Sequence, residues 1–215
     1  MENITKIYTD FDGTITKHDA VNRFFELYAD KKWEEYEALW VDGKISSREN
    51  AIKQVALIRP MDKSVLENYI NNIEIDETFL DFYKEINARG IELVILSDGF
   101  DLFIKETLRR LGIENVKFFA NHLIFKDNKF SIEFPYYTDK CLKKSGNCKC
   151  AQIKEKDFVY IGDGTSDLCV AKKAKILFAS KYLDKYCYNH NINHISFNSF
   201  GDILENIKNE NYKNL

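Results

Sequence analysis

The sequence predicts an α/β fold: a Rossmann-like parallel sheet whose first strand is followed by an inserted helical bundle. From residue 76 onward, strand-like and helix-like segments alternate, which is typical of a parallel sheet. The segment from Ile91 to Leu96 is apolar except for Glu92, as expected of a strand covered on both faces. Residues 19–73, in contrast, show helical spacing and no convincing strand.

The first strand is expected from Lys6 to Phe11, where it ends in acidic residues. The helical stretch after it carries apolar stripes at helical spacing and a capping box, Ser46 with Glu49. We therefore expect residues 1–14 and 75–215 to form a catalytic core, with residues 15–74 as a helical cap over one edge of the sheet. The stripes, which are more typical of core than of a cofactor site, are Phe24, Phe25 and Tyr28; Trp33, Tyr36 and Trp40; and, after a cap at Asp62, Val65, Leu66, Tyr69 and Ile73.

The second half of the chain continues the alternation. Asp76 is expected to cap a helix that stops at Gly90, and Gly112 is expected to end the next one. The expected strands are 91–96, 116–120, a hairpin of 123–125 with 130–134, 158–161, 175–179 with a helix before it, and one near Ile195, followed by a last helix at 202–208.

Composition narrows the classes of function. Of the 215 residues, 45% are hydrophobic and the formal net charge is −3, with no long basic run. Neither nucleic acid nor an anionic membrane surface is therefore an expected partner. No apolar stretch reaches membrane-spanning length and the first residues do not resemble a signal peptide, so we expect a cytoplasmic protein with five reduced cysteines.

Acidic side chains follow several of the predicted strands. Asp10 and Asp12 end the first strand, and Asp163 and Asp167 follow a later one. Because the carboxyl ends of parallel strands meet at one rim, these four carboxylates should lie close together. Like charges at such distances are unstable alone, and Mg²⁺, which prefers a few carboxylates plus substrate phosphate, is the expected remedy.

Each of these motifs has an ordinary structural explanation. Asp-x-Asp-Gly is usually a turn, Gly-Asp-Gly is usually a loop, and Ser97 after a strand is usually a helix cap. Their occurrence together, each at a predicted strand end and in this order, indicates a functional site.

In this combination the sequence resembles the haloacid dehalogenase superfamily of phosphatases. The first motif matches residues 10–14 (Asp-Phe-Asp-Gly-Thr), the second Ser97, and the fourth residues 162–167 (Gly-Asp-Gly-Thr-Ser-Asp). The third motif is a lysine before a helix, and Lys149 fits best because Ile153 follows one helical turn later. The competing lysines nearby are Lys140, Lys143, Lys144 and Lys154.

The resemblance implies a role for each motif residue. Asp10 would be the nucleophile that forms an aspartyl-phosphate, and Asp12 the general acid and base. Asp163 would complete a Mg²⁺ site with these two, while Asp167 would either join the metal or hold the lysine. The phosphate oxygens would be bound by Ser97, Lys149 and backbone groups near Gly13 and Gly99.

A helical insertion after the first motif is the cap of the phosphoserine phosphatase-like branch. Within it, residues 10–19 and the cysteine-rich approach to Lys149 are most similar to methionine-salvage phosphatases, which act on 2-hydroxy-3-keto-5-methylthiopentenyl-1-phosphate. Asp19 stands where that branch holds a substrate amine, although it is equally suited to cap a helix. Gln54 replaces the arginine that binds the carboxylate of phosphoserine, and an amide is a poor substitute for a guanidinium. Asp98 also departs from the usual Ser-Gly-Gly form.

Other functions remain open from the sequence. We expect a monomer or homodimer acting on a small phosphorylated metabolite, with phosphoserine, phosphoethanolamine, phosphocholine or nucleotide phosphatases and a phosphotransferase as alternatives. A receiver-like module phosphorylated on Asp10 is the non-enzymatic alternative, but it would lack the helical insertion. Cys141, Cys148 and Cys150 could bind zinc, but reduced thiols in a loop are the favoured interpretation, because Cys-x-x-Cys spacing is absent.

Overall fold

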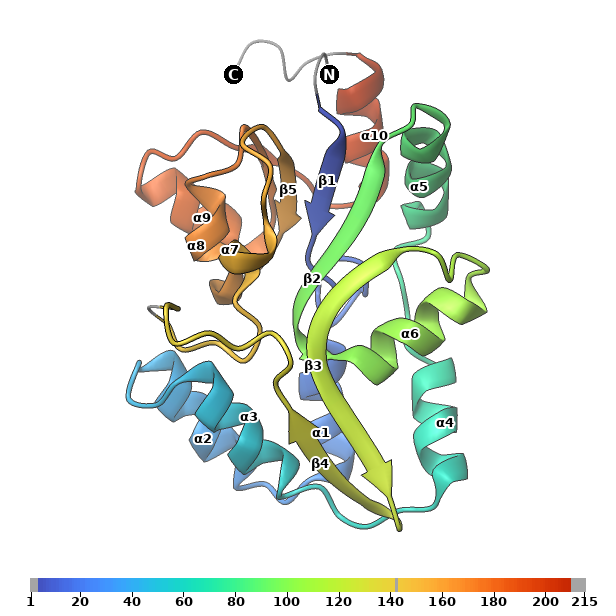
Figure 1. Cartoon of the computed structure of the whole chain (residues 1–215), viewed down its shortest axis with the longest axis vertical. Helices are drawn as coiled ribbons and strands as arrows, with labels where there is room; N and C mark the ends of the chain where they lie inside the picture. Colours follow the sequence, from blue (N-terminus) through green and yellow to red (C-terminus); the bar gives the residue numbers. More distant parts are fainter. Residues whose placement is uncertain (1–3, 142, 210–215) are drawn as a thin grey trace.

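Seven strands form one sheet in the order β4-β3-β2-β1-β5-β6-β7 in the computed structural model, which describes residues 4–141 and 143–209. All neighbouring pairs are parallel except β3 and β4, which form an antiparallel hairpin (Figure 1). The predicted parallel α/β sheet is thus confirmed. The strands are β1 (Lys6–Thr9), β2 (Glu92–Phe100), β3 (Lys117–Lys126), β4 (Lys129–Glu133), β5 (Val159–Gly162), β6 (Ile176–Ala179) and β7 (Ile195–Ser196).

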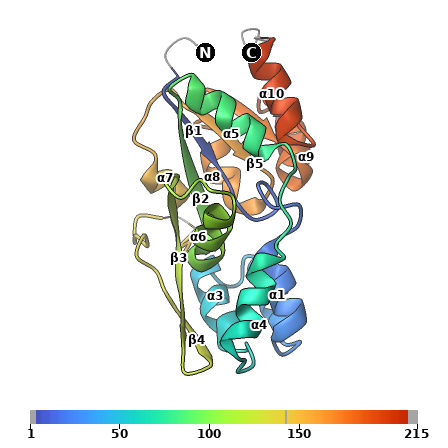
Figure 2. The ribbon, with the colours of Figure 1, turned by 90° about the vertical axis from the view of Figure 1, so that its right-hand side faces the viewer.

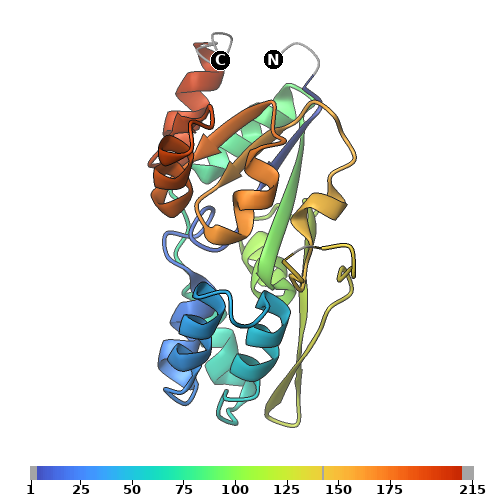
Figure 3. The ribbon, with the colours of Figure 1, turned by 90° about the vertical axis from the view of Figure 1, so that its left-hand side faces the viewer.

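Helices cover both faces of the sheet, so its central strands are buried on both sides. Along β1, Ile7 belongs to one hydrophobic cluster and Tyr8 to the other, as the pleat of a strand requires. Helices α5, α6 and α10 contribute to the first cluster, and α7, α8 and α9 to the second (Figures 2 and 3). Their bounds are α5 (Phe79–Ala88), α6 (Asp101–Arg110), α7 (Lys149–Gln152), α8 (Leu168–Ala171), α9 (Lys181–Asn189) and α10 (Phe200–Lys208).

Four helices between β1 and β2 lie beyond the carboxyl ends of the central strands (Figure 1). They sit beside the β3–β4 hairpin at the end of the sheet, whereas the sequence suggested a place over a sheet edge. Phe24 anchors them, with ring centroids 5.3 Å from Phe103 on α6 and 5.8 Å from Phe130 on β4. The helices are α1 (Ala20–Tyr28), α2 (Trp33–Val41), α3 (Ser47–Val55) and α4 (Lys63–Asn71).

Three strand boundaries differ from expectation. β1 ends at Thr9, because the Phe11 carbonyl already accepts the backbone N–H groups of the turn that follows. β2 continues to Phe100, so Ser97 lies within the strand. β3 is one strand from Lys117 to Lys126 where two were expected, because Asn121 stays extended and pairs with Phe100.

Two helices also differ from expectation. Asp76 does not cap α5, whose N-cap is Thr78; its carboxylate instead accepts from the backbone N–H of Thr78 and, 2.9 Å away, from that of Phe200. Helix α9 was not predicted at all. Among the described residues, no helix combines the length and apolarity needed to cross a membrane.

Candidate active site

Asp10 is the first residue after β1 and lies almost fully buried at the carboxyl edge of the sheet, with 5% of its surface exposed. Its backbone N–H donates to the Ile161 carbonyl of β5 at 2.9 Å, which fixes its position between two strand ends. Its Oδ1 accepts from the backbone N–H of Phe11 at 2.7 Å, and its Oδ2 lies 2.7 Å from Lys149 Nζ. The carboxylate is therefore held rigidly in one orientation.

Gly13 shapes the turn after Asp10. Its φ of +75° is in the left-handed region that favours glycine. A Cβ on this residue would lie 2.5 Å from Asp163 Oδ2, so the turn also needs the missing side chain for space. Thr14, the next residue, donates its hydroxyl to Asp163 Oδ1 at 3.0 Å. The first and fourth motifs are thus in direct contact.

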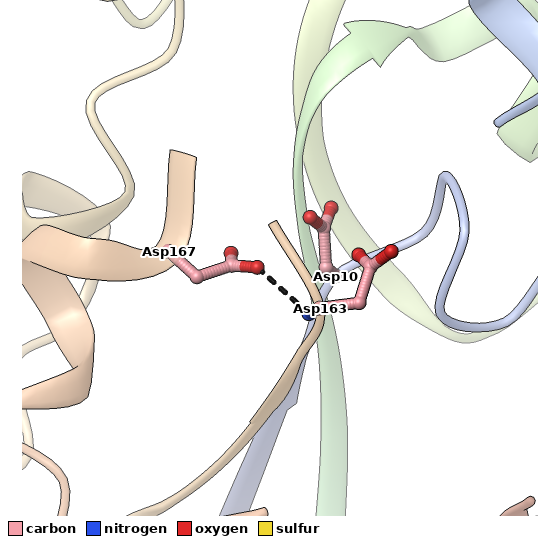
Figure 4. A group of neighbouring side chains, drawn as sticks. All are labelled: Asp10, Asp163 and Asp167. Atoms are coloured by element: carbon pink, nitrogen blue, oxygen red, sulfur yellow. Dashed lines mark hydrogen bonds between the residues drawn. The ribbon is translucent and has the colours of Figure 1, made fainter. Parts of the chain in front are cut away.

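Three carboxylates converge at this point (Figure 4). Asp10, Asp163 and Asp167 each place one oxygen within 4.8 Å of the others. Burial raises the pKa of Asp10 well above its usual range, and the charge of Asp167 adds to the effect. Burial and Asp167 likewise raise the pKa of Asp163. Such crowding of hard oxygen donors fits a divalent cation such as Mg²⁺, because a cation offsets the repulsion.

The cysteines do not form a comparable group. Among the described residues, the three aspartates are the only set of three metal-ligand side chains that lies so close. All five cysteines are free thiols, in accord with the expectation of reduced cysteines. The arrangement does not favour a zinc site on Cys141, Cys148 and Cys150.

Lys149 lies against the carboxylates, at the start of α7. It is 2% exposed, and its Nζ is 2.7 Å from Asp10 Oδ2 and 2.6 Å from Asp167 Oδ1. Burial alone would lower the pKa of Lys149, but the two carboxylates raise it above its usual range. The structure therefore brings this lysine to the strand ends. The competing lysines are all exposed to solvent: Lys140, Lys143, Lys144 and Lys154.

Asp167 is surrounded by protein donors. Its Oδ1 accepts from Lys149 and from the Tyr160 hydroxyl. Its Oδ2 accepts from the backbone N–H groups of Asp163 and Gly164, both at 3.0 Å. Because both oxygens are already bonded, the geometry favours the role of holding Lys149 over that of a metal ligand.

Asp12 points to the second motif. The Ser97 hydroxyl donates to Asp12 Oδ2 at 3.2 Å, and the backbone N–H of Gly99 donates to Ser97 Oγ at 2.8 Å. A Cβ on Gly99 would overlap Asp12 Oδ2. The other oxygen, Asp12 Oδ1, is buried without a partner in the described part of the chain. Burial, followed by the nearby charge of Asp19, raises the pKa of Asp12 to about 8.

A cavity of about 530 Å³ connects these residues to the helices after β1. Asp10, Asp12 and Asp163 line its floor, and residues of α1, α2 and α3 line its other side. Asp19 lines it as well and also caps α1, accepting from the Asn22 backbone N–H at 2.8 Å. A larger cavity of about 830 Å³, outside α1 and α4, includes Asp19 but none of the strand-end carboxylates. The smaller cavity is therefore the candidate site.

Three residues of the site escaped the sequence analysis. Lys181 follows β6 at the same rim, and its Nζ lies 3.2 Å from Asp163 Oδ2 and donates to the Gly13 carbonyl. Its place after a strand was the signal that could have identified it. Tyr160 and Glu37 carried no such signal, because a buried strand tyrosine and a helix glutamate are common.

Asp98 links three parts of the structure. Its Oδ1 accepts from the backbone N–H of Asn147 at 2.9 Å and from Asn121 Nδ2 at 3.2 Å. Its Oδ2 accepts from the hydroxyl of Ser47, the first residue of α3. Burial raises the pKa of Asp98 in spite of these donors. The residue that departs from the usual second motif thus connects the strand to the helical segment.

Comparison with known proteins gives a consistent picture. A family model for haloacid dehalogenase-like hydrolases matches residues 7–172. The 2-hydroxy-3-keto-5-methylthiopentenyl-1-phosphate phosphatase of Bacillus velezensis is 29% identical over 94% of this chain and 89% of its own. The enzyme of the same name from Bacillus pumilus is 30% identical over 90% and 87%.

Solved structures share the fold. A haloacid dehalogenase-family hydrolase from Salmonella enterica superposes with a TM-score of 0.74 at 19% identity, covering 95% of this chain and 72% of its own. A phosphoserine phosphatase from T. onnurineus gives a TM-score of 0.72 at 20% identity, covering 96% of both chains. At these identities the likeness establishes the fold alone. Because the family model covers most of the chain, including Asp10, Lys149 and Asp163, the chain belongs to the haloacid dehalogenase-like hydrolases, as its strand-end motifs predicted.

Proposed function

We propose that this hydrolase is a Mg²⁺-dependent phosphomonoesterase that forms an aspartyl-phosphate on Asp10. We further propose that its substrate is the small metabolite 2-hydroxy-3-keto-5-methylthiopentenyl-1-phosphate, as in the methionine-salvage enzymes. The observation that carries the activity is the meeting of Asp10, Asp12 and Lys149 at one buried strand edge beside a cavity. The substrate rests on the relatives of that name, which match nearly the whole chain.

Each residue has a proposed role in the first step. An oxygen of Asp10 attacks phosphorus in line, and the bond from phosphorus to the leaving oxygen breaks. Asp12 gives its proton to that oxygen. Lys149, Ser97 and backbone N–H groups near Gly13 and Gly99 bind the phosphoryl oxygens, where donors matter most as charge spreads in the transition state.

The second step regenerates the carboxylate. Asp12 takes a proton from water, the water oxygen attacks phosphorus, and the bond to Asp10 breaks to release inorganic phosphate. Mg²⁺, held by the carboxylates of Asp10 and Asp163 and the Asp12 carbonyl, would supply neutralising charge at the phosphate. Asp167 acts as a positioning residue for Lys149.

We propose the same division of the chain as its sequence suggests. Residues 1–14 and 75–215 would be the catalytic core, and residues 15–74 a cap that bounds the substrate cavity. The position of α1, α2 and α3 along that cavity supports this division. A monomer or homodimer in the cytoplasm remains the prediction for the assembly.

Phosphoserine is the alternative substrate that the structural relatives raise. Gln54 argues against it, because its Nε2 already donates to Glu37 at 3.0 Å and is not free to bind a carboxylate. Phosphoethanolamine, phosphocholine, nucleotides and transfer to another acceptor are best separated by a substrate panel. A receiver-like module, by comparison, would have no use for Asp12 as an acid and base.

The substitution Asp10→Asn tests the activity. Wild-type protein should hydrolyse p-nitrophenyl phosphate and the proposed substrate only with Mg²⁺, and Asp10→Asn should hydrolyse neither while keeping its circular dichroism spectrum. Asp81→Asn, on the exposed face of α5, is the matched control and should remain active. Normal turnover by Asp10→Asn would exclude the proposed nucleophile.

A further inference from the structure

Glu37, on α2, is held in place by two amides of α3. Asn50 Nδ2 donates to Glu37 Oε2 at 2.9 Å, and Gln54 Nε2 donates to the same oxygen at 3.0 Å. Gln54 is itself oriented by the Trp33 carbonyl, 3.4 Å from its Nε2. Asn50 and Gln54 are 5% and 4% exposed, so the donors are fixed in the interior. Two buried amides thus present one carboxylate in a defined orientation.

The Glu37 carboxylate has no cationic partner in the described part of the chain. Its Oε1 accepts no hydrogen bond there, and no described lysine, arginine or histidine forms an ion pair with it. Glu37, Asn50 and Gln54 all line the 530 Å³ cavity that opens onto Asp10 and Asp12. The charge therefore faces the space above the reacting groups.

The cap side of this cavity has acceptors in excess of donors. Asn50 Oδ1 is buried without a partner in the described chain. Asp19 adds a second carboxylate, and burial, with the charge of Glu37 contributing, raises its pKa to about 6. Among the lysines and arginines described, only Lys181 lines the cavity, and its Nζ is engaged at the phosphate end with Asp163 and Gly13. A ligand must supply the missing donors.

We propose that Glu37 is the specificity-determining residue of this site and that it accepts a hydrogen bond from a hydroxyl or ammonium group of the leaving alcohol. Leaving groups that carry a carboxylate are disfavoured, because they would meet Glu37 and Asp19 without a basic side chain to bind them. The inference rests on the proposed phosphatase activity and specifies its substrate class: phosphate esters of non-anionic, donor-bearing alcohols.

The physical basis is the cost of an unmatched polar group. A site built to hydrogen-bond a substrate rejects analogues without that group by large factors, since its own buried polar atoms stay unpaired. Aromatic and apolar side chains, including Phe25 and Trp40, form other parts of the wall and strengthen the interaction by excluding water.

Two matched substrate pairs test the inference. Glycerol 3-phosphate and 3-phosphoglycerate differ by a hydroxymethyl group in place of a carboxylate, and phosphoethanolamine and phosphoserine differ by an added carboxylate. Wild-type protein should favour the first member of each pair by at least tenfold in kcat/KM. Comparison of glycerol 3-phosphate with phosphoethanolamine then distinguishes a hydroxyl from an ammonium donor.

The isosteric Glu37→Gln should remove this selectivity. The amides of Asn50 and Gln54 can hold the new carbonyl, so that its NH₂ faces the cavity as a donor. The kcat/KM ratio of the donor-bearing substrates to p-nitrophenyl phosphate, whose leaving group has no donor, should fall at least tenfold, and the preference within each pair should shrink or reverse. Glu35→Gln, exposed on the same helix, should keep both ratios.

The failures are distinguishable. Mg²⁺-dependent turnover of p-nitrophenyl phosphate without selectivity in wild type, or with selectivity unchanged in Glu37→Gln, would overturn the role of Glu37 and leave the phosphatase assignment standing. No turnover of any of these esters would overturn the phosphatase assignment, and the role of Glu37 with it.

Discussion

Lys149 Nζ lies 2.7 Å from Asp10 Oδ2, in a part of the protein that solvent barely reaches. The same ammonium is 2.6 Å from Asp167 Oδ1. A buried charge of this kind is tolerated only with close partners of opposite sign, and removing one partner leaves the others uncompensated. The three residues therefore form one unit in which stability and catalysis are linked.

Lys149→Met should damage both properties. It removes the proposed phosphate ligand, so kcat/KM for p-nitrophenyl phosphate should fall by roughly 10²–10³-fold or more. It also leaves Asp10 and Asp167 without a cation, which should lower the free energy of unfolding by about 3–5 kcal/mol. Steady-state kinetics and urea unfolding measure the two effects. Lys154→Met, at an exposed position, is the control, and equal effects in both variants would contradict the assignment.

Removal of the metal should abolish activity and lower thermal stability. The carboxylates of Asp10 and Asp163 are crowded and buried, so a cation that binds them stabilises the folded state by mass action. Chelation should stop hydrolysis, and Mg²⁺ should restore it and raise the melting temperature in a concentration-dependent way. Asp163→Asn should weaken both responses at least tenfold in Mg²⁺ concentration, whereas Asp157→Asn, at an exposed ion pair with Lys175, should change neither. An Mg²⁺ response that survives in Asp163→Asn would place the metal elsewhere.

Gly13→Ala and Gly43→Ala separate backbone strain from the site itself. Both glycines have similar positive φ, +75° and +70°, so alanine should cost each about 1–2 kcal/mol of stability. A Cβ at Gly13 also meets Asp163 Oδ2, whereas nothing lies within 4 Å of one at Gly43. Only Gly13→Ala should lose activity, by tenfold or more, together with Mg²⁺ affinity. Equal kinetics in the two variants would show that the close approach to Asp163 is unimportant.

Glu155 should make stability depend on pH. Burial opposes its ionisation, but Lys6, 2.7 Å away, and the Tyr8 hydroxyl outweigh it and lower the pKa of Glu155 to about 2. The stabilisation is thus present above the ordinary pKa of 4.5 and is lost as pH falls toward 2. Because the carboxyl is 23% exposed, screening should limit it to about 1–2 kcal/mol. Urea unfolding of wild type and Glu155→Gln should differ by this amount at pH 7 and converge between pH 5 and pH 3; a constant difference would refute the linkage.

Much of the fold and the strand-end motifs could be predicted from local sequence. Buried parallel strands are continuous apolar runs, and the carboxyl ends of such strands must share a rim, so the nearness of Asp10 and Asp163 follows from the pattern. Lys149 was the preferred lysine on its spacing to Ile153. What failed were properties that depend on tertiary contacts: Asp76 reads as a helix cap, yet it binds the backbone of Phe200 from the far end of the chain.

The cap side was less predictable for the same reason. Glu37 lies between Tyr36 and Trp40 in a helix whose apolar stripe is evident, but the sequence does not reveal which face meets the strand ends. Its two amide partners come from another helix. Lys181 begins a helix that was not predicted, so its place at the rim depended on an element that was missing from the interpretation.

The hydrogen bond between Ser47 and Asp98 should affect substrate binding, because it joins α3 of the cap to the strand that carries Ser97. Ser47→Ala removes it, while Asp98 keeps its donors from Asn121 and Asn147. The neighbouring Ser46→Ala is a matched control: it removes the N-cap bond to the Glu49 backbone N–H at 3.1 Å and does not touch Asp98.

Both serine variants should lose about 1 kcal/mol of stability, one through the cap contact and one through the helix N-cap. Only Ser47→Ala should raise KM, by about three- to tenfold, since the cavity wall formed by α3 is then less firmly held over Asp10, while the motif residues that determine kcat keep their positions. Steady-state kinetics with the proposed substrate, beside urea unfolding, provide the measurement. A parallel rise of KM in Ser46→Ala would attribute the effect to general loosening of α3, and an unchanged KM in Ser47→Ala would show that Asp98 serves only the core.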